Sequence, residues 1–353
     1  MTDISKVSLR TRIRQLDLAE MPTWVSTILI VALAFLIGGV IIYAIGANPF
    51  AAYASLVEAA FGSVNGIAET MVKACPLMLA GLGIAVAYRA KFWNIGAEGQ
   101  IYAGGILAAV VGINFAFLPA VILLPVTLLA GVLGGAFWGF IPGLLKARLK
   151  VNEVITTLML NYIIIEITAY LVHGPMRDMS SGITISPQLA RGAWLPIIVP
   201  RTRFHLGIVL GIIMAFIVSW MVYKTVLGFQ IRAVGERART ARFAGIPVES
   251  TIIWTMIISG ALAGLAGAAE VSGVQHRLVE AFSPGYGYLA IAVALLANLE
   301  PLGVIPSSIL FAALLNGADA MQRAAAVPVP VIYVIEGLVI FFIAIRILQR
   351  KVD

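Results

Sequence analysis

Long apolar stretches, separated by short segments that carry most of the charges, dominate the chain. A helix needs about 20 apolar residues to cross the hydrocarbon core of a bilayer. Runs of this kind predict ten spans: 24–46, 68–88, 97–117, 119–143, 151–171, 206–225, 250–270, 286–299, 303–320 and 331–347. Glycine and proline interrupt several of them, and 286–299 is short enough to predict a half-helix or re-entrant segment. We therefore expect an all-α, polytopic membrane helix bundle with some broken helices.

One membrane domain is expected to make up nearly the whole chain, because no stretch outside the spans is long enough to be a soluble catalytic domain. This domain covers 24–347, between a basic N-terminal segment, 1–23, and a short C-terminal segment, 348–353. The connections that stand out by length or composition are 47–65, 172–205 and 226–249. The first of these has the composition of an amphipathic helix.

Composition agrees with a protein that is solvated by hydrocarbon. Hydrophobic residues make up 61% of the chain and charged residues 12%, whereas soluble domains are about 45–50% apolar and about 25% charged. The net charge of +7 comes from basic residues between the spans. It is not part of a basic surface with interleaved aromatics, so no nucleic acid is expected as a partner. The single cysteine, Cys75, precedes Pro76 in an apolar run, which indicates a structural role.

The distribution of basic residues predicts the orientation. With the N-terminus inside, 17 of the 24 Lys and Arg residues fall on the inner side. They lie in 1–23, 89–91, 146–150, 224–242 and 346–353. Because basic residues accumulate on the cytoplasmic side of a membrane, we expect both termini and 226–249 in the cytoplasm, and 172–205 outside.

The stretch FWNIGAEGQ, residues 92–100, places polar side chains between glycines where the chain is expected to enter the bilayer. Polar groups are costly at that depth unless they face protein or a water-filled cavity, and glycine permits non-helical backbone there. Trp93, Asn94, Glu98 and Gln100 are therefore candidates to line a polar pathway at a broken helix. The alternative is a cytoplasmic turn in which Glu98 lies near a helix N-terminus, where the helix dipole favours its charge.

A second polar stretch, KVNEVITTLMLNY at 150–162, begins the fifth span. Residues three or four positions apart are neighbours on a helix. The polar positions from Asn152 and Glu153 to Asn161 and Tyr162 therefore form a stripe. Such a stripe is expected to face the bundle interior, where it either lines the pathway or holds helices together.

Glu166 lies further along the same span, and an ionisable group inside the membrane is a functional candidate by default. A second start broken by glycine and proline, SPGYGY at 283–288, supplies Tyr286 as a further pathway candidate. It loosely mirrors 93–99, as an internal repeat would. Small residues that predict tight packing of 250–270 are Gly260, Gly264 and Gly267.

Arginines and small residues alternate in RAVGERARTARFAGIP, residues 232–247, within an expected cytoplasmic connection. A plain cytoplasmic loop needs only positive charge. This segment also has small residues that permit close approach, and helix propensity that ends at Gly245. We therefore favour a short helix that docks onto another protein. The residues assigned to that contact are Gly235, Glu236, Arg237, Arg239, Thr240, Ala241, Gly245 and Ile246.

The sequence contains no GxxxxGK[ST] phosphate loop, no HExxH, and no pair of Cys or His at metal-ligand spacing. We therefore expect no metal site, no cofactor and no ATP hydrolysis by this chain itself. Work done by the protein must come from an ion gradient, a partner subunit or downhill flow.

Together, FWNIGAEGQ, KVNEVITTLMLNY and RAVGERARTARFAGI resemble the membrane permeases of ABC importers in the branched-chain amino acid/ribose permease superfamily. The subgroup for nucleosides or simple sugars is the most similar, and the resemblance covers nearly the whole chain. It implies a bacterial plasma (inner) membrane protein that works with a second permease, cytoplasmic ABC ATPase subunits and an extracytoplasmic substrate-binding lipoprotein. It also implies that 235–246 seats in a groove on the ATPase, and that the two permeases form a heterodimer.

Within this resemblance the expected cargo is neutral, a purine nucleoside or a simple sugar. Trp93, Tyr162 and Tyr286 offer aromatic faces that suit a base. The alternative is an ion-coupled secondary transporter of a small polar solute, because broken helices and buried acids such as Glu98 and Glu153 also occur there. A membrane enzyme acting on lipid-linked substrates is disfavoured, because no acid/base or metal set converges in the sequence.

Overall fold

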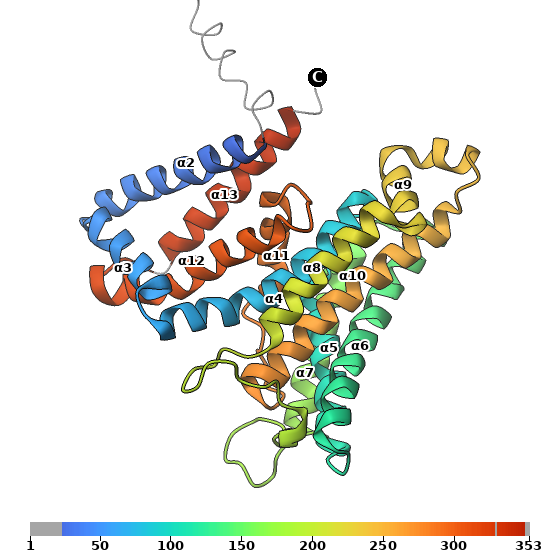
Figure 1. The fold of residues 1–353 in the computed structure, drawn as a ribbon, viewed down its shortest axis with the longest axis horizontal. Coiled ribbons are helices and arrows are strands. Elements are labelled where there is room, and N and C mark those ends of the chain that lie inside the picture. Colours follow the sequence, from blue (N-terminus) through green and yellow to red (C-terminus); the bar gives the residue numbers. More distant parts are fainter. Residues whose placement is uncertain (1–22, 329, 350–353) are drawn as a thin grey trace, which may run out of the picture. The chain divides into compact units, whose positions relative to one another are not determined.

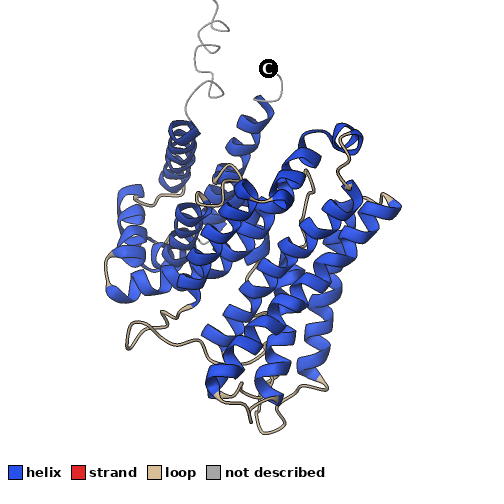
Figure 2. Ribbon diagram, turned by 45° about the vertical axis from the view of Figure 1, so that its right-hand side comes forward, coloured by secondary structure: helices blue, strands red, loops and turns tan. Residues whose placement is uncertain are grey.

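The computed structural model describes residues 23–328 and 330–349, so the basic N-terminal residues and the last residues of the C-terminal segment lie outside it. Within the described residues the protein is all-α (Figures 1 and 2). Extended pairing there is limited to two isolated bridges, Ile185 with Val279 and Ile197 with His205. The predicted fold class is confirmed.

The α-helices are α2 (Thr23–Ala44), α3 (Pro49–Phe61), α4 (Val64–Arg89), α5 (Ala97–Asn114), α6 (Ala120–Leu149), α7 (Glu153–His173), α8 (Gly207–Lys224), α9 (Val226–Phe243), α10 (Val248–Glu270), α11 (Tyr286–Leu296), α12 (Val304–Ala325) and α13 (Pro330–Gln349). A short 3-10 helix, η1 (Arg191–Ala193), lies in the connection between α7 and α8, and a π-helical turn, η2 (Val271–Gln275), continues α10.

Each of the ten expected spans corresponds to one helix, namely α2, α4 to α8 and α10 to α13. In the part of the chain that the structure describes, five helices are long and apolar enough to cross a membrane by length and composition: Val64–Arg89, Ala120–Leu149, Glu153–His173, Gly207–Lys224 and Val248–Gln275. Shorter apolar helices are Ile28–Ala44, Tyr286–Leu296, Val304–Ala318 and Pro330–Phe342. The chain is a multi-pass membrane protein.

Several bounds differ from the expectation. α6 continues past 143 to Leu149, and it ends where Lys150 takes a left-handed conformation with φ 55°. α11 has 11 residues, about half of what a span requires, which agrees with the predicted half-helix. The connection expected at 226–249 is mostly helical, because α9 fills it.

The chain divides into two compact units. Unit 1 consists of Met1–Ser55 and Ala318–Asp353. Within it α2 packs against α13, and the Tyr53 hydroxyl donates to the Phe35 carbonyl at 2.5 Å. Unit 2, Leu56–Gly317, contains every residue assigned above to the pathway and to docking.

Glycines allow α5, α6 and α10 to approach closely inside unit 2. A Cβ on Gly264 of α10 would overlap the Gly131 carbonyl oxygen and lie 2.7 Å from the Gly135 Cα on α6. A Cβ on Gly104 of α5 would overlap the backbone of Gly264. In a bilayer, helix association relies on such van der Waals contact, because lipid is as apolar as the side chains. The predicted small-residue packing of α10 is confirmed.

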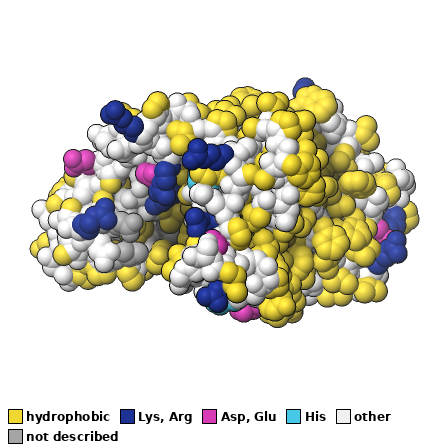
Figure 3. Space-filling view, turned by 90° about the horizontal axis from the view of Figure 1, so that it is seen from below, with side chains coloured by type: hydrophobic (Ala, Val, Ile, Leu, Met, Phe, Trp, Pro, Cys, Tyr) yellow, Lys and Arg dark blue, Asp and Glu magenta, His cyan; other side chains and the backbone are white. Residues whose placement is uncertain are grey.

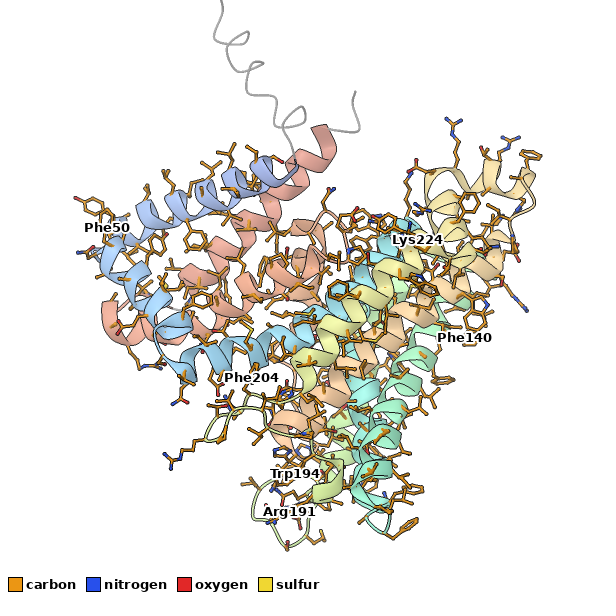
Figure 4. The ribbon with its side chains drawn as sticks, viewed as in Figure 1. Phe50, Phe140, Arg191, Trp194, Phe204 and Lys224 are labelled. Carbon is orange, nitrogen blue, oxygen red and sulfur yellow. The ribbon has the colours of Figure 1, made fainter. Side chains whose placement is uncertain are left out.

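The two ends of unit 2 carry different structures. The long loop between α7 and α8, with Arg191 and Trp194, lies at one end, and Lys224 at the junction of α8 and α9 lies at the other (Figure 4). We call these the loop end and the α9 end. Figure 3 is viewed from the side of the loop end and shows broad apolar areas between small groups of Lys and Arg.

Gly264→Val should destabilise the protein, because the added atoms would meet the α6 backbone and force the helices apart. Overpacking costs about 1–3 kcal/mol, so we expect a lower thermal unfolding midpoint in detergent. Gly182→Val is the matched control, since nothing lies within 4 Å of a Cβ built there. Equal midpoints for the two variants would contradict the packing argument.

Candidate functional site

α5 begins inside the bundle, because the chain before it enters in a non-helical conformation. The Asn94 side chain is fully buried and donates to Ser259 Oγ of α10 at 2.9 Å and to Gln100 Oε1 at 3.0 Å. Its Oδ1 accepts the Gly96 N–H at 2.9 Å. Ser259 is eleven residues beyond Val248, the first residue of α10, which at 1.5 Å per residue is about 16 Å along the helix. These contacts therefore lie at membrane depth.

Glu98 connects the starts of two helices. It lies in the first turn of α5 and is 2% exposed. Its Oε2 accepts the N–H of Gly287, in the first turn of α11, at 2.6 Å. The Ser283 side chain and the Gly285 backbone N–H also interact with this carboxylate. Because a helix N-terminus has unpaired N–H groups and a positive dipole end, the α11 start supplies donors to the buried Glu98 side chain.

The close approach of α5 and α11 depends on a missing side chain. A Cβ on Gly287 would overlap the backbone nitrogen of Glu98. Gly285 has φ +91°, a left-handed conformation that favours glycine at the start of α11. The two glycines of SPGYGY therefore allow the start of α11 to lie against the start of α5.

Asn161 joins α7 to both broken starts. Its side chain is buried, and its Oδ1 accepts the Gly99 N–H at 2.9 Å. Its Nδ2 donates to the Ile95 carbonyl at 3.0 Å and to the Tyr288 hydroxyl at 3.2 Å. The polar junction, as we call this cluster, consists of Asn94, Glu98, Gln100, Asn161, Ser259, Gly287 and Tyr288.

Four of the nine sequence-predicted pathway residues thus lie in the polar junction, and the other five do not. Asn152 accepts N–H bonds at the start of α7, and Glu153 pairs with Lys146 at 2.5 Å. Trp93 is half exposed and packs against Tyr88. The remaining two are Tyr162, which is 57% exposed on α7, and Tyr286, which is buried at the first position of α11.

Sequence reasoning missed three members of the polar junction. Tyr288 and Gly287 lie in the SPGYGY segment, from which Tyr286 was chosen. The sequence therefore indicated the right segment, but nothing in it favoured Gly287 or Tyr288 over Tyr286. Ser259 precedes the glycine-rich part of α10 and gave no separate signal. The contact between Ser259 and Asn94 is seen only in the folded structure.

α9 consists of two helical parts. Arg237, with φ −153° and ψ 96°, interrupts the helix. The first part is held in place at Gly235, where a Cβ would overlap the Arg89 carbonyl oxygen at the end of α4. Glu236, Arg237, Arg239 and Thr240 are exposed. The second part therefore projects beyond the bundle at the α9 end.

The projecting part ends in a tight glycine turn. Gly245 has φ +82°, its N–H bonds to the Arg242 carbonyl at 3.1 Å, and the Ile246 N–H bonds to the Ala241 carbonyl at 3.0 Å. This is the Schellman arrangement, in which a left-handed residue satisfies the last helix carbonyls. Ile246 also packs against the small apolar cluster to which Ala241 belongs. Phe243 remains 82% exposed beside Arg239.

The loop end is folded against the segment that follows η2. The Leu189 N–H bonds to the His276 carbonyl at 2.9 Å, and the Leu278 N–H bonds to Ser186 Oγ at 2.8 Å. The Trp194 ring stacks on His276 with centroids 3.9 Å apart. The loop therefore forms a cap held by backbone bonds.

Two side chains beside α8 extend this cap. Burial lowers the pKa of His205 to about 4, so this imidazole is neutral at pH 7. Its Nδ1 accepts the Gly207 N–H at 3.1 Å. Arg203 donates its Nε to Glu69 Oε1 at 2.8 Å and its Nη2 to Oε2, and the Glu69 carboxylate raises the pKa of Arg203.

Comparison with known proteins identifies the family. The family described as branched-chain amino acid transport system / permease component matches residues 66–344. The chain belongs to this family. Its members are permease subunits, the membrane components of transport systems, and they are not enzymes.

Three relatives resemble this permease over most of both chains. They are the nucleoside ABC transporter permease NupB of Lactococcus lactis (34% identical, over 90% of this chain and 89% of the relative), the guanosine ABC transporter permease NupP of Bacillus subtilis (37%, over 87% and 89%) and the glucose ABC transporter permease TsgB13 of Haloferax volcanii (35%, over 91% and 88%). More distant are NupC of the same Lactococcus at 23% and NupQ of the same Bacillus at 24%. No solved structure gives a significant match. The matches give no support to the ion-coupled alternative.

Asn161→Leu should destabilise this permease, because the buried Gly99 N–H would lose its acceptor. A buried polar group without a partner costs about 1–3 kcal/mol, so the thermal unfolding midpoint in detergent should fall. Tyr162→Phe, at the exposed neighbouring position, is the matched control and should leave the midpoint unchanged. If Asn161→Leu behaves like this control, the polar junction does not hold α5 and α7 together.

Proposed function

We propose that this permease forms, with partner subunits, an ATP-driven importer for a nucleoside, in the first place a purine nucleoside, or for a simple sugar. The observation that carries this proposal is the similarity to nucleoside, guanosine and glucose permeases over at least 87% of this chain. A neutral cargo is compatible with the polar junction, because its buried amides and its carboxylate are already bonded within the protein and leave no free charge for an ion. Tyr162, which follows Asn161 in the sequence, and Tyr288, which bonds to Asn161, add partly exposed aromatic side chains.

A second permease subunit completes the pathway in this proposal. Glu166 is exposed on α7, thirteen residues beyond Glu153 and thus about 20 Å along the helix. A carboxylate at that depth is costly against lipid and is expected to face protein or water. We therefore place α7 against the partner permease and the pathway. The match of two different permeases from each of two bacteria, NupB with NupC and NupP with NupQ, supports a heterodimer.

α9 is the proposed docking element for the cytoplasmic ABC ATPase, which would bind and hydrolyse the ATP. Its projecting part exposes basic side chains and Phe243, a combination that suits a groove with apolar walls and an acidic rim. This assignment puts the α9 end in the cytoplasm, in agreement with the basic residues of 224–242 and the expected inner-membrane orientation with both termini cytoplasmic. The loop end then faces outward, where its folded cap would receive the substrate-binding lipoprotein. The permease itself needs no cofactor in this scheme.

Uptake of labelled guanosine should fall to the background level in cells from which this gene is deleted, and it should return with the wild-type gene. Labelled glucose, measured in parallel, distinguishes the nucleoside from the sugar. Unchanged uptake of both compounds would contradict the proposed function.

Gly235→Val should weaken ATPase docking while the protein still inserts, because the added side chain would meet the Arg89 carbonyl and displace α9. A displacement that costs 1.4 kcal/mol of docking free energy reduces affinity about tenfold. We expect a loss of that order in the amount of ATPase that co-purifies, with a matching loss of uptake. Gly182→Val is the control for a glycine without neighbours. Wild-type co-purification and uptake in Gly235→Val would rule out a docking role for α9.

A further inference from the structure

A cluster of side chains at the α9 end joins four elements of unit 2 around Arg89, the last residue of α4. The Arg89 side chain is 13% exposed, and its Nη2 donates to Tyr223 Oη at 2.7 Å and to Glu300 Oε1 at 2.8 Å. Its Nε donates to the Leu299 carbonyl at 3.1 Å. One guanidinium therefore holds the end of α8 and the turn between α11 and α12.

α9 contacts the same cluster in three places. The Gly235 Cα packs on the Arg89 carbonyl so closely that no Cβ fits. Lys91 Nζ donates to the Glu236 carbonyl at 3.3 Å. The Arg232 guanidinium lies 5.4 Å from the centre of the Tyr223 ring. A displacement of the first part of α9 therefore acts directly on Arg89 and its partners, and the projecting part is joined to it through the break at Arg237.

The turn that Arg89 holds is conformationally unusual. Asn298 and Leu299 are consecutive non-glycine residues with φ values of 54° and 61°. A left-handed conformation is strained for residues that carry a Cβ, and it persists where surrounding contacts impose it. The bond from Arg89 to the Leu299 carbonyl, together with the pair to Glu300, supplies such contacts. Arg89 thus fixes the position of the C-terminal end of α11.

The other end of α11 is the one bonded to Glu98. The helix has 11 residues, so its ends are about 16 Å apart, and a helix this short moves as a rigid rod. A cavity of 310 Å³ lies beside the Arg89 end and is lined in part by Arg232, Asn298 and Glu300. The turn therefore borders free space into which it can move.

We propose that Arg89 is a positioning residue which transmits the movement of α9 through α11 to the polar junction. When α9 moves with the ATPase, Arg89 shifts the Leu299–Glu300 turn, and α11 carries the shift to the Glu98 carboxylate. Arg89 touches neither the cargo nor ATP in this scheme. The inference rests on the proposed function, because it assigns the route by which that ATPase acts on the pathway.

The test uses the complete importer in proteoliposomes, with Arg89→Glu, Glu300→Arg, the double exchange and Arg89→Lys. Two quantities are measured: the amount of ATPase that co-purifies, and the increase in ATP hydrolysis when the guanosine-loaded receptor is added. Each single charge reversal should retain the ATPase and lose about tenfold of the stimulation, which corresponds to about 1.4 kcal/mol of coupling. The double exchange should recover the part that depends on the ion pair, because a glutamate at position 89 cannot donate to the Leu299 carbonyl. Arg89→Lys should lie between, because lysine keeps the charge but lacks the planar fork.

Lys146→Gln is the matched control, since it removes another ion pair of unit 2, the one with Glu153, which is not part of the Arg89 cluster. Its stimulation should equal that of the wild type. A merely structural role for Arg89 would lower the unfolding midpoint and the ATPase yield together, and the double exchange would not restore stimulation. If Arg89→Glu keeps its stimulation within about twofold of the wild type, a difference of only about 0.4 kcal/mol, the inference about Arg89 is wrong. The proposed function would not be affected by that result. A wild-type permease that retains no ATPase would overturn the proposed function and this inference with it.

Discussion

A carboxylate buried in a membrane bundle requires hydrogen-bond donors that stay in place, and Glu98 obtains its donor from the first turn of α11. The requirement is reciprocal. α11 starts inside the protein, and backbone N–H groups without partners are expensive in hydrocarbon. The interaction of Glu98 with Gly287 therefore permits both α5 and α11 to be broken helices. Asn94 accepts the Gly96 N–H, and Asn161 bonds the Gly99 N–H and the Ile95 carbonyl, at the α5 start.

Two kinds of contact hold the helices of unit 2 together. α5, α6 and α10 meet backbone to backbone at glycines, and such packing cannot shift without opening voids. α11 packs along α4 and meets the α5 backbone at Gly287, and polar groups bond both of its ends, Glu98 at one and Arg89 at the other. Hydrogen bonds can be exchanged between alternative partners, whereas interlocked backbones have one good arrangement. These contacts suit a rigid frame of α5, α6 and α10, relative to which the short helix α11 shifts.

The length of the apolar runs in the sequence was sufficient to predict the all-α class and a helix for each expected span, because the bilayer requires about 20 apolar residues per span. The broken starts at 92–100 and 283–288 were also predictable, since glycine beside polar residues has few other uses at that depth. Their mutual contact was not predictable. Glu98 and Gly287 are 189 positions apart, and no local pattern encodes which helix N-terminus a carboxylate will meet.

The same limit explains the site residues that the fold separates. Asn152 and Glu153 carry the polar pattern of a pathway, but the helix begins at them, so Asn152 caps α7 and Glu153 pairs with Lys146. Sequence spacing defines a helix face and leaves open how deep each position lies. Gly235 illustrates the converse case. Its small size indicated a close approach, and the fold identified the neighbour as the Arg89 carbonyl.

The turn at Gly245 has a consequence for the kinetics of assembly. Because the Schellman bonds and the packing of Ile246 already fix the projecting part of α9, this segment loses little conformational freedom when it meets a partner. Association of a preorganised helix avoids the ordering penalty that a flexible loop incurs. In the proposed importer, a preformed helix would also transmit movement of the ATPase to the permease more directly than a flexible loop.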